Sequence, residues 1–145
     1  MVILDLEWNR GYDNKLLGDI LQIGAVRVEY LRGPVADTFN AYIGPTVHRR
    51  FDLGAKQLPD LRMSQESELD FVTVLEMFRT WCGAETEYAA WGNDDLATLT
   101  QNCEQRKNGA GQGGGCWRAD ARQRRQRRPT PFWPPNFTDF QVCRL

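Results

Sequence analysis

Two carboxylates in an apolar run near the start of the chain have the chemistry to hold a divalent cation. Asp5 and Glu7 stand two residues apart in VILDLEW, residues 2–8. On a β-strand this spacing places both side chains on the same face. Like charges held close together in an apolar setting are unfavourable unless a cation compensates them, and Mg²⁺ is the natural partner of carboxylate oxygens. An acidic strand face in contact with water explains the same spacing equally well.

A second group of acids follows another apolar run. In WGNDDLATL, residues 91–99, a glycine turn leads into what reads as a helix, and Asp94 and Asp95 stand at its start. Acids at this position stabilise a helix by capping and by their interaction with its dipole. Capping therefore explains Asp94 or Asp95 in isolation, without any function.

The elements that must position these acids can be predicted from apolar periodicity. Extended runs with turn signals between them predict strands, and the i, i+3, i+4, i+7 pattern after a capping Asp70 predicts a helix. The order is βββαβα, which indicates an α/β layer fold. The predicted strands are residues 2–8, 20–31, 38–45 and 86–91, and the predicted helices are residues 71–81 and 94–105.

Composition narrows the class of protein. The chain has 145 residues, of which 41% are hydrophobic, and this is enough for one packed domain. It contains no apolar run approaching the ~20 residues of a membrane-spanning helix, so no membrane partner is expected. The acidic first residues do not resemble a signal peptide, and the four cysteines form no CxxC pair. We therefore expect a cytoplasmic protein with reduced thiols and no zinc site.

The net charge of −1 is the sum of an acidic first segment and a basic second segment of the chain. Residues 1–105 hold 17 acids and 9 bases, whereas residues 106–145 hold 2 acids and 9 bases. The second segment is rich in Gly, Arg and Pro and has no apolar periodicity. We interpret residues 1–105 as the folded domain and residues 106–145 as an irregular or disordered tail.

Four segments in order resemble the DnaQ-like family, the DEDD-type 3′–5′ exonucleases of the ribonuclease-H-like superfamily. They are ILDLEWN, then LQIGAVRV, then the helix ending FRTWCG, then the strand leading to WGNDDLATLTQN. The amino-acid sequences of the first and last segments most resemble the RNA-trimming branch of the histone-mRNA exonuclease type. The resemblance covers residues 1–105 and implies a ribonuclease-H-like mixed sheet flanked by helices, with its C-terminal part incomplete.

The resemblance also implies site residues and a mechanism. Asp5, Glu7 and Asp95 would be the catalytic ligands of two Mg²⁺ or Mn²⁺ ions, with Asp94 as the alternative to Asp95. Asp5 would bridge both ions, and Glu7 would hold the ion that activates water. Leu6 and Trp8 would contact the terminal nucleotide, unless they serve only in packing. The partner would be the 3′ end of a single-stranded nucleic acid, with RNA favoured over DNA, and the reaction two-metal hydrolysis of the terminal phosphodiester.

The family's third motif, a His followed by an Asp on a C-terminal helix, is missing. Residues 106–145 contain no His and no Tyr, and their only acids are Asp120 and Asp139. His48, the one histidine, lies between the first two motifs and reads as a surface-loop residue. The sequence therefore assigns neither the general base nor the fourth acid.

This departure leaves an alternative function open. A truncated or frame-shifted copy would keep the partial fold and bind nucleic acid without cleaving it. The five arginines of RQRRQRR, residues 122–128, are either a solvated charge run or an arm that contacts phosphates.

Overall fold

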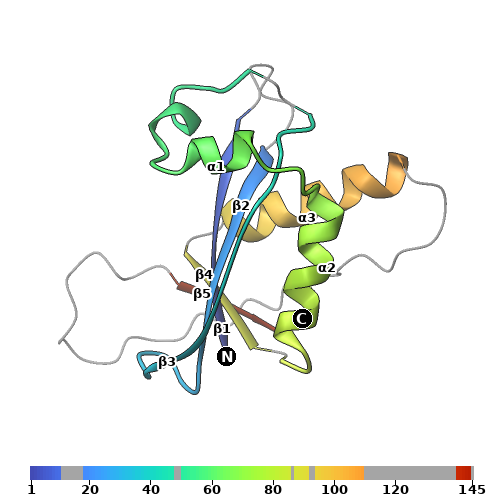
Figure 1. The fold of residues 1–145 in the computed structure, drawn as a ribbon. Coiled ribbons are helices and arrows are strands. Elements are labelled where there is room, and N and C mark those ends of the chain that lie inside the picture. The colour runs from blue at the N-terminus through green and yellow to red at the C-terminus, as the bar shows by residue number, and fades with distance from the viewer. Residues whose placement is uncertain (11–17, 48–49, 86, 92–93, 110–139, 145) are drawn as a thin grey trace.

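The computed structural model describes residues 1–10, 18–47, 50–85, 87–91, 94–109 and 140–144. They form a mixed α/β structure in which a twisted sheet is flanked by helices (Figure 1). The strands are β1 (Val2–Asn9), β2 (Asp19–Val28), β3 (Val35–Tyr42), β4 (Glu87–Trp91) and β5 (Phe140–Arg144). The helices are the 3₁₀ turn η1 (Ala55–Gln57), α1 (Leu61–Gln65), α2 (Phe71–Cys82) and α3 (Asp94–Gly109).

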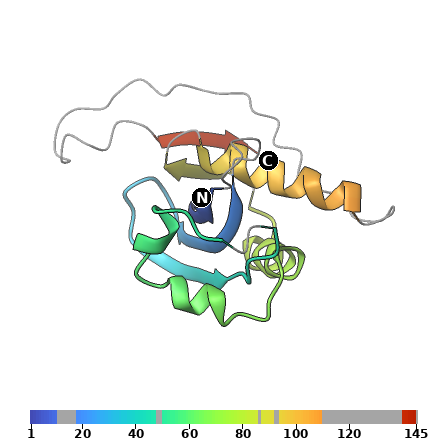
Figure 2. The same cartoon turned by 90° about the horizontal axis from the view of Figure 1, so that it is seen from above.

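The strand that carries the first acidic pair lies at the centre of the sheet. The described strands are ordered β3-β2-β1-β4-β5, with β1 antiparallel to β2 and parallel to β4. Strand β2 is antiparallel to β3, and β5 is antiparallel to β4. Viewed from above, β4 and β5 lie on one side of the N-terminal strand and β3 lies on the other (Figure 2). Because β1 and β4 are parallel, their carboxyl ends, and the acids near them, come to the same edge of the sheet.

The pairing of β1 with β2 contains an irregularity beside these acids. Glu7 pairs with Gln22, but the next residue, Trp8, pairs with Ile20, so β2 contributes Leu21 as an extra residue. The Leu21 carbonyl oxygen instead accepts hydrogen bonds from the backbone N–H of Ile43 at 2.7 Å and from the Ser64 hydroxyl at 2.8 Å. A bulge of this kind increases the local twist and is typical of positions next to a functional site.

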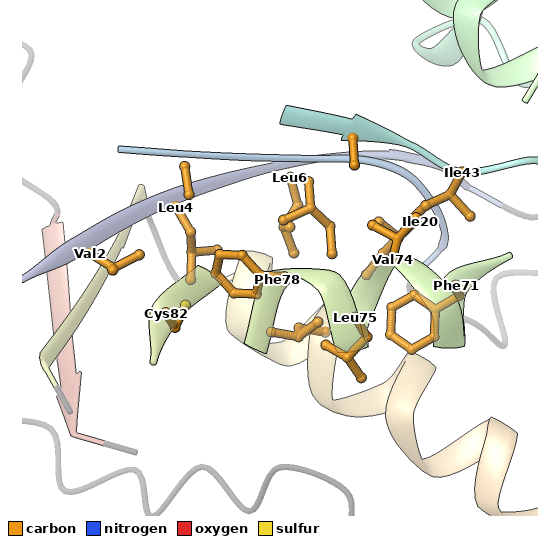
Figure 3. Packing of buried hydrophobic residues seen from close by; sticks show 14 of the residues in the cluster. Val2, Leu4, Leu6, Ile20, Ile43, Phe71, Val74, Leu75, Phe78 and Cys82 are labelled. Carbon is orange, nitrogen blue, oxygen red and sulfur yellow. The ribbon is translucent and has the colours of Figure 1, made fainter. Parts of the chain in front are cut away.

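The apolar core lies between one face of the sheet and helix α2 (Figure 3). Leu4 and Leu6 of β1 point toward Val74 and Phe78 of α2, and all four are at most 3% exposed. Helix α2 begins where Asp70 caps it by accepting a hydrogen bond from the Thr73 N–H at 2.8 Å. Its apolar residues follow the helical period and so form one continuous face.

The sequence predicted this order of elements correctly. The βββαβα sequence of strands and helices is present, and the α/β class is confirmed. Three elements were not predicted: η1, α1 and the strand β5. Helix α3 extends to Gly109, and β5 lies within residues 106–145, for which the sequence predicted an irregular tail; residues 110–139 lie outside the described part. No helix in the described ranges is long and apolar enough to cross a membrane.

The packing of α2 leads to a stability prediction. Phe78 is 1% exposed and lies 5.3 Å, between ring centroids, from Phe39 of β3. We expect Phe78→Ala to lower the free energy of unfolding by ~3–5 kcal/mol, because it leaves a cavity in the core. Urea unfolding measures this change. Met77→Ala, on the neighbouring position that is 44% exposed, is the control; an equal loss in both variants would contradict the described orientation of α2.

Candidate active site

The two acids of β1 lie on the sheet face opposite the core. Asp5 pairs with Gly24 and Glu7 with Gln22, whereas the intervening Leu6 pairs with Ile23 on the core side. Asp5 is exposed and Glu7 is half-buried. This register places Asp5 and Glu7 on the same face of the strand, as their spacing predicted.

The third predicted ligand comes from the start of helix α3. Asp95 is only 3% exposed, and its Oδ1 accepts a hydrogen bond from the backbone N–H of Leu6 at 3.3 Å. This bond joins the second acidic motif to the first, across 89 residues of sequence. Asp94, the alternative ligand, is exposed. The geometry therefore favours Asp95 as the acid that is held against β1.

Helix α3 is fixed in this position by a buried amide. Asn102 is 1% exposed, and its Nδ2 donates to the Gly18 carbonyl oxygen at 2.7 Å, while its Oδ1 accepts from the Ile20 N–H at 3.5 Å. The two bonds tie α3 to the start of β2. Since β2 pairs with β1, the same bonds help to fix the distance between Asp95 and the acids of β1.

All of the predicted site residues line one cavity of about 650 Å³. This volume lies within the range of ~300–1,000 Å³ that is typical of pockets for small ligands. The predicted residues among the lining are Asp5, Leu6, Glu7, Trp8, Asp94 and Asp95.

The ring of Trp8 packs against Gly18, which directly precedes β2. A Cβ atom at Gly18 would lie 2.2 Å from Cδ1 of the Trp8 ring, so only glycine leaves room for the indole. Leu6 is 3% exposed and belongs to the core cluster, whereas Trp8 is half-buried and packs against it.

The remaining lining residues of the cavity were not predicted from the sequence. Arg10 and a segment around η1 complete the described lining, the latter through Asp52, Gly54, Ala55 and Leu58. Arg10 is the one basic side chain in that lining. The short segment has no apolar period, which is why its structure was not predicted. An Asp followed three residues later by the start of a turn is the local signal that was available, and Asp52 Oδ1 indeed accepts from the Ala55 N–H at 2.7 Å.

Burial raises the pKa of all three carboxylates, and neighbouring charges add to the shift at Glu7 and Asp95. Burial, and then the charges of Asp5, Asp94 and Glu7, raise the pKa of Asp95 to about 7, although the Leu6 N–H opposes the shift. Although the Asp5 side chain is exposed, partial desolvation of its carboxyl group raises its pKa against the Leu6 N–H, which lowers it. Burial and then the Asp5 charge raise the pKa of Glu7. The site therefore disfavours its own negative charge, and a bound cation would relieve this cost.

The donor chemistry fits a hard divalent cation, but no closed coordination cage is present. Carboxylate oxygens are the ligands that Mg²⁺ and Mn²⁺ prefer. Within the described ranges, no three His, Cys, Asp or Glu side chains are grouped tightly enough to hold a metal ion. The carboxylates line one cavity without converging on a point, so they would have to move together around an ion.

Several predicted or considered residues fall outside the described part of the chain. They are His48, Asp120, Asp139 and the arginines of residues 122–128. The described lining contains neither a histidine nor a tyrosine. The site as described thus supplies carboxylates and one guanidinium, and the general base stays unassigned.

Comparison with known proteins adds no relative. No model of a protein family matches the sequence, and a search of curated proteins finds no match.

The raised pKa of Asp95 predicts how stability depends on pH without metal. Since the unfolded chain releases this proton at a lower pH than the folded chain, the free energy of unfolding should fall as pH rises from about 4 to about 7. Asp95→Asn keeps an Oδ1 acceptor for the Leu6 N–H and removes the charge. We expect it to stabilise the metal-free chain at pH 8 by ~1–2 kcal/mol, and by close to zero at pH 4.

Thermal unfolding at the two pH values, with and without Mg²⁺, measures this difference. Asp94→Asn is the matched control, because Asp94 stands next to Asp95 but is exposed. Mg²⁺ should reduce the advantage of Asp95→Asn at pH 8. An equal effect of the variant at both pH values would contradict the proposed charge repulsion.

Proposed function

We propose that the chain carries the site of a metal-dependent 3′–5′ exonuclease, which hydrolyses the terminal phosphodiester of single-stranded nucleic acid, with RNA favoured over DNA. The observation that carries this proposal is the meeting of both acidic motifs in one cavity, where Asp95 of α3 accepts a hydrogen bond from Leu6, between Asp5 and Glu7. Capping alone explains an acid at the start of α3, but it does not explain why that acid is buried against β1.

The resemblance to DnaQ-like exonucleases supports the same function independently of this geometry. It rests on the order of the four motifs, and the described elements follow that order in a mixed α/β structure. A ribonuclease-H-like fold is part of the proposal.

Asp5, Glu7 and Asp95 would hold two Mg²⁺ or Mn²⁺ ions. When bound, such a pair stabilises the attacking and leaving oxygens of an in-line phosphoryl displacement. The chain's own contribution is to bring these carboxylates to one cavity near the end of a central strand, despite their repulsion. Trp8 and Leu58 give the cavity apolar surface for a base, and Arg10 offers a cation to a phosphate.

The test is the release of mononucleotides from single-stranded RNA that carries a 5′ label, with Mg²⁺ or Mn²⁺ present. Progressive shortening of the labelled strand shows attack from the 3′ end. We expect Asp5→Asn, Glu7→Gln and Asp95→Asn each to lower kcat/KM about a hundredfold or more, because each removes a charged ligand.

Glu68→Gln is the matched control, since Glu68 is exposed and does not line the cavity. It should retain the activity of the parent chain. A folded parent without activity would contradict the proposal, and so would equal activity in Asp5→Asn and Glu68→Gln. RNA binding without cleavage would favour the alternative, a catalytically incomplete relative.

A further inference from the structure

The second wall of the cavity is attached to the end of β1 by a set of hydrogen bonds that the proposed chemistry does not use. We call these bonds the Asn9–Asp52 clamp. They join Asn9 and Arg10, directly after the acidic strand face, to residues 50–55, which lead into η1.

Asn9 supplies the first half of the clamp. Its side chain is completely buried, at 0% exposure. Its Oδ1 accepts from the Asp52 N–H at 2.9 Å, and its Nδ2 donates to the Arg50 carbonyl oxygen at 3.1 Å. The side-chain amide thus offers one acceptor and one donor to a neighbouring backbone, as a peptide group does between paired strands.

Asp52 supplies the second half. Its Oδ2 accepts from the Arg10 N–H at 2.9 Å, and its Oδ1 accepts from the Ala55 N–H at 2.7 Å. Its own carbonyl oxygen accepts from the Lys56 N–H at 3.1 Å. One carboxylate therefore both closes the turn that begins η1 and binds that turn to β1.

The clamp determines where the apolar wall stands relative to the acids. Ala55 and Leu58 line the cavity from the η1 side, whereas Asp5 and Glu7 line it from β1. Asn9 is not among the described lining residues, so it acts on the cavity through the segment that it holds.

We propose that Asn9 and Asp52 are positioning residues, which set the width of the cavity and thereby the affinity for the terminal nucleotide. This inference rests on the proposed function. If the η1 segment were less firmly held, the affinity for the nucleotide would fall, while the carboxylates of β1 and α3 would keep their positions. The clamp should therefore act on KM more than on kcat.

The experiment compares Asn9→Ala, Asp52→Asn and the double variant Asn9→Ala/Asp52→Ala with the parent chain and with Glu68→Gln. Two readouts are used: kcat and KM on the labelled single-stranded RNA, and the Kd of adenosine 5′-monophosphate with Mn²⁺. All assays are run well below the lowest unfolding midpoint. The second readout needs no turnover.

We expect Asn9→Ala to raise KM and Kd about tenfold, with kcat changed less than about threefold. Asp52→Asn keeps one of its two acceptor oxygens, so its effect should be smaller. The single variant Asp52→Ala completes the double-mutant cycle, and it should raise KM and Kd at least as much as Asp52→Asn does. KM and Kd of the double variant should be about as high as those of whichever single Ala variant has the higher values, because both substitutions break the same connection between β1 and the η1 segment.

An active parent whose KM and Kd are unchanged by Asn9→Ala would overturn the inference and leave the proposed function standing. A parent that neither cleaves the RNA nor binds the nucleotide would overturn both. If Asn9→Ala does not fold, Asp52→Asn decides: unchanged KM and Kd in that variant would also overturn the inference.

Discussion

The structure of the site depends on one constraint, the repulsion among carboxylates that are held together at the end of a central strand. Asp95 is nearly inaccessible to water, yet it faces the charges of Asp5, Glu7 and Asp94. The hydrogen bond from the Leu6 N–H compensates only part of this cost. An asparagine at this position would accept the same hydrogen bond without the charge, so stability alone does not explain the aspartate.

The rest of the described fold serves to maintain that arrangement. The apolar face of α2 buries Leu4 and Leu6, which fixes the strand and turns Asp5 and Glu7 to the opposite face. Asn102 ties α3 to β2 and so keeps Asp95 beside β1. The Asn9–Asp52 clamp brings the η1 segment to the other side of the cavity. Two of these features depend on buried amides, Asn102 and Asn9, whose hydrogen bonds join distant parts of the sequence.

The sequence predicted what depends on local pattern. The apolar run of residues 2–8 predicted the strand, the spacing of its two acids predicted their shared face, and the helical period after Asp70 predicted α2. The acids at the start of α3 were also visible, but capping explained them equally well. The burial of Asp95 against Leu6 could not be predicted, because it depends on a contact between residues that are 89 positions apart.

The conformation of the segment around η1 could not be predicted either, because it too depends on contacts between distant residues. Residues 50–58 have no apolar period, and their conformation is set by side chains of other segments, above all by the amide of Asn9. In the sequence, Asn9 is only the first residue after the predicted strand of residues 2–8. The sequence assigns neither the fourth acid nor the general base of the proposed mechanism; the described lining holds two further acids, Asp52 and Asp94, and no histidine or tyrosine.

The central claim is that Asp5, Glu7 and Asp95 form one cation site, and the ionisation of Asp95 tests it most directly. The measurement is a pH titration of the side-chain carboxyl carbon of Asp95 by NMR, with and without Mg²⁺. Without metal, the account predicts a pKa of about 7; with saturating Mg²⁺, it predicts a pKa below the ordinary value for an aspartate, because the cation stabilises the charged form. A pKa that Mg²⁺ does not move would contradict the claim that this carboxylate is a metal ligand.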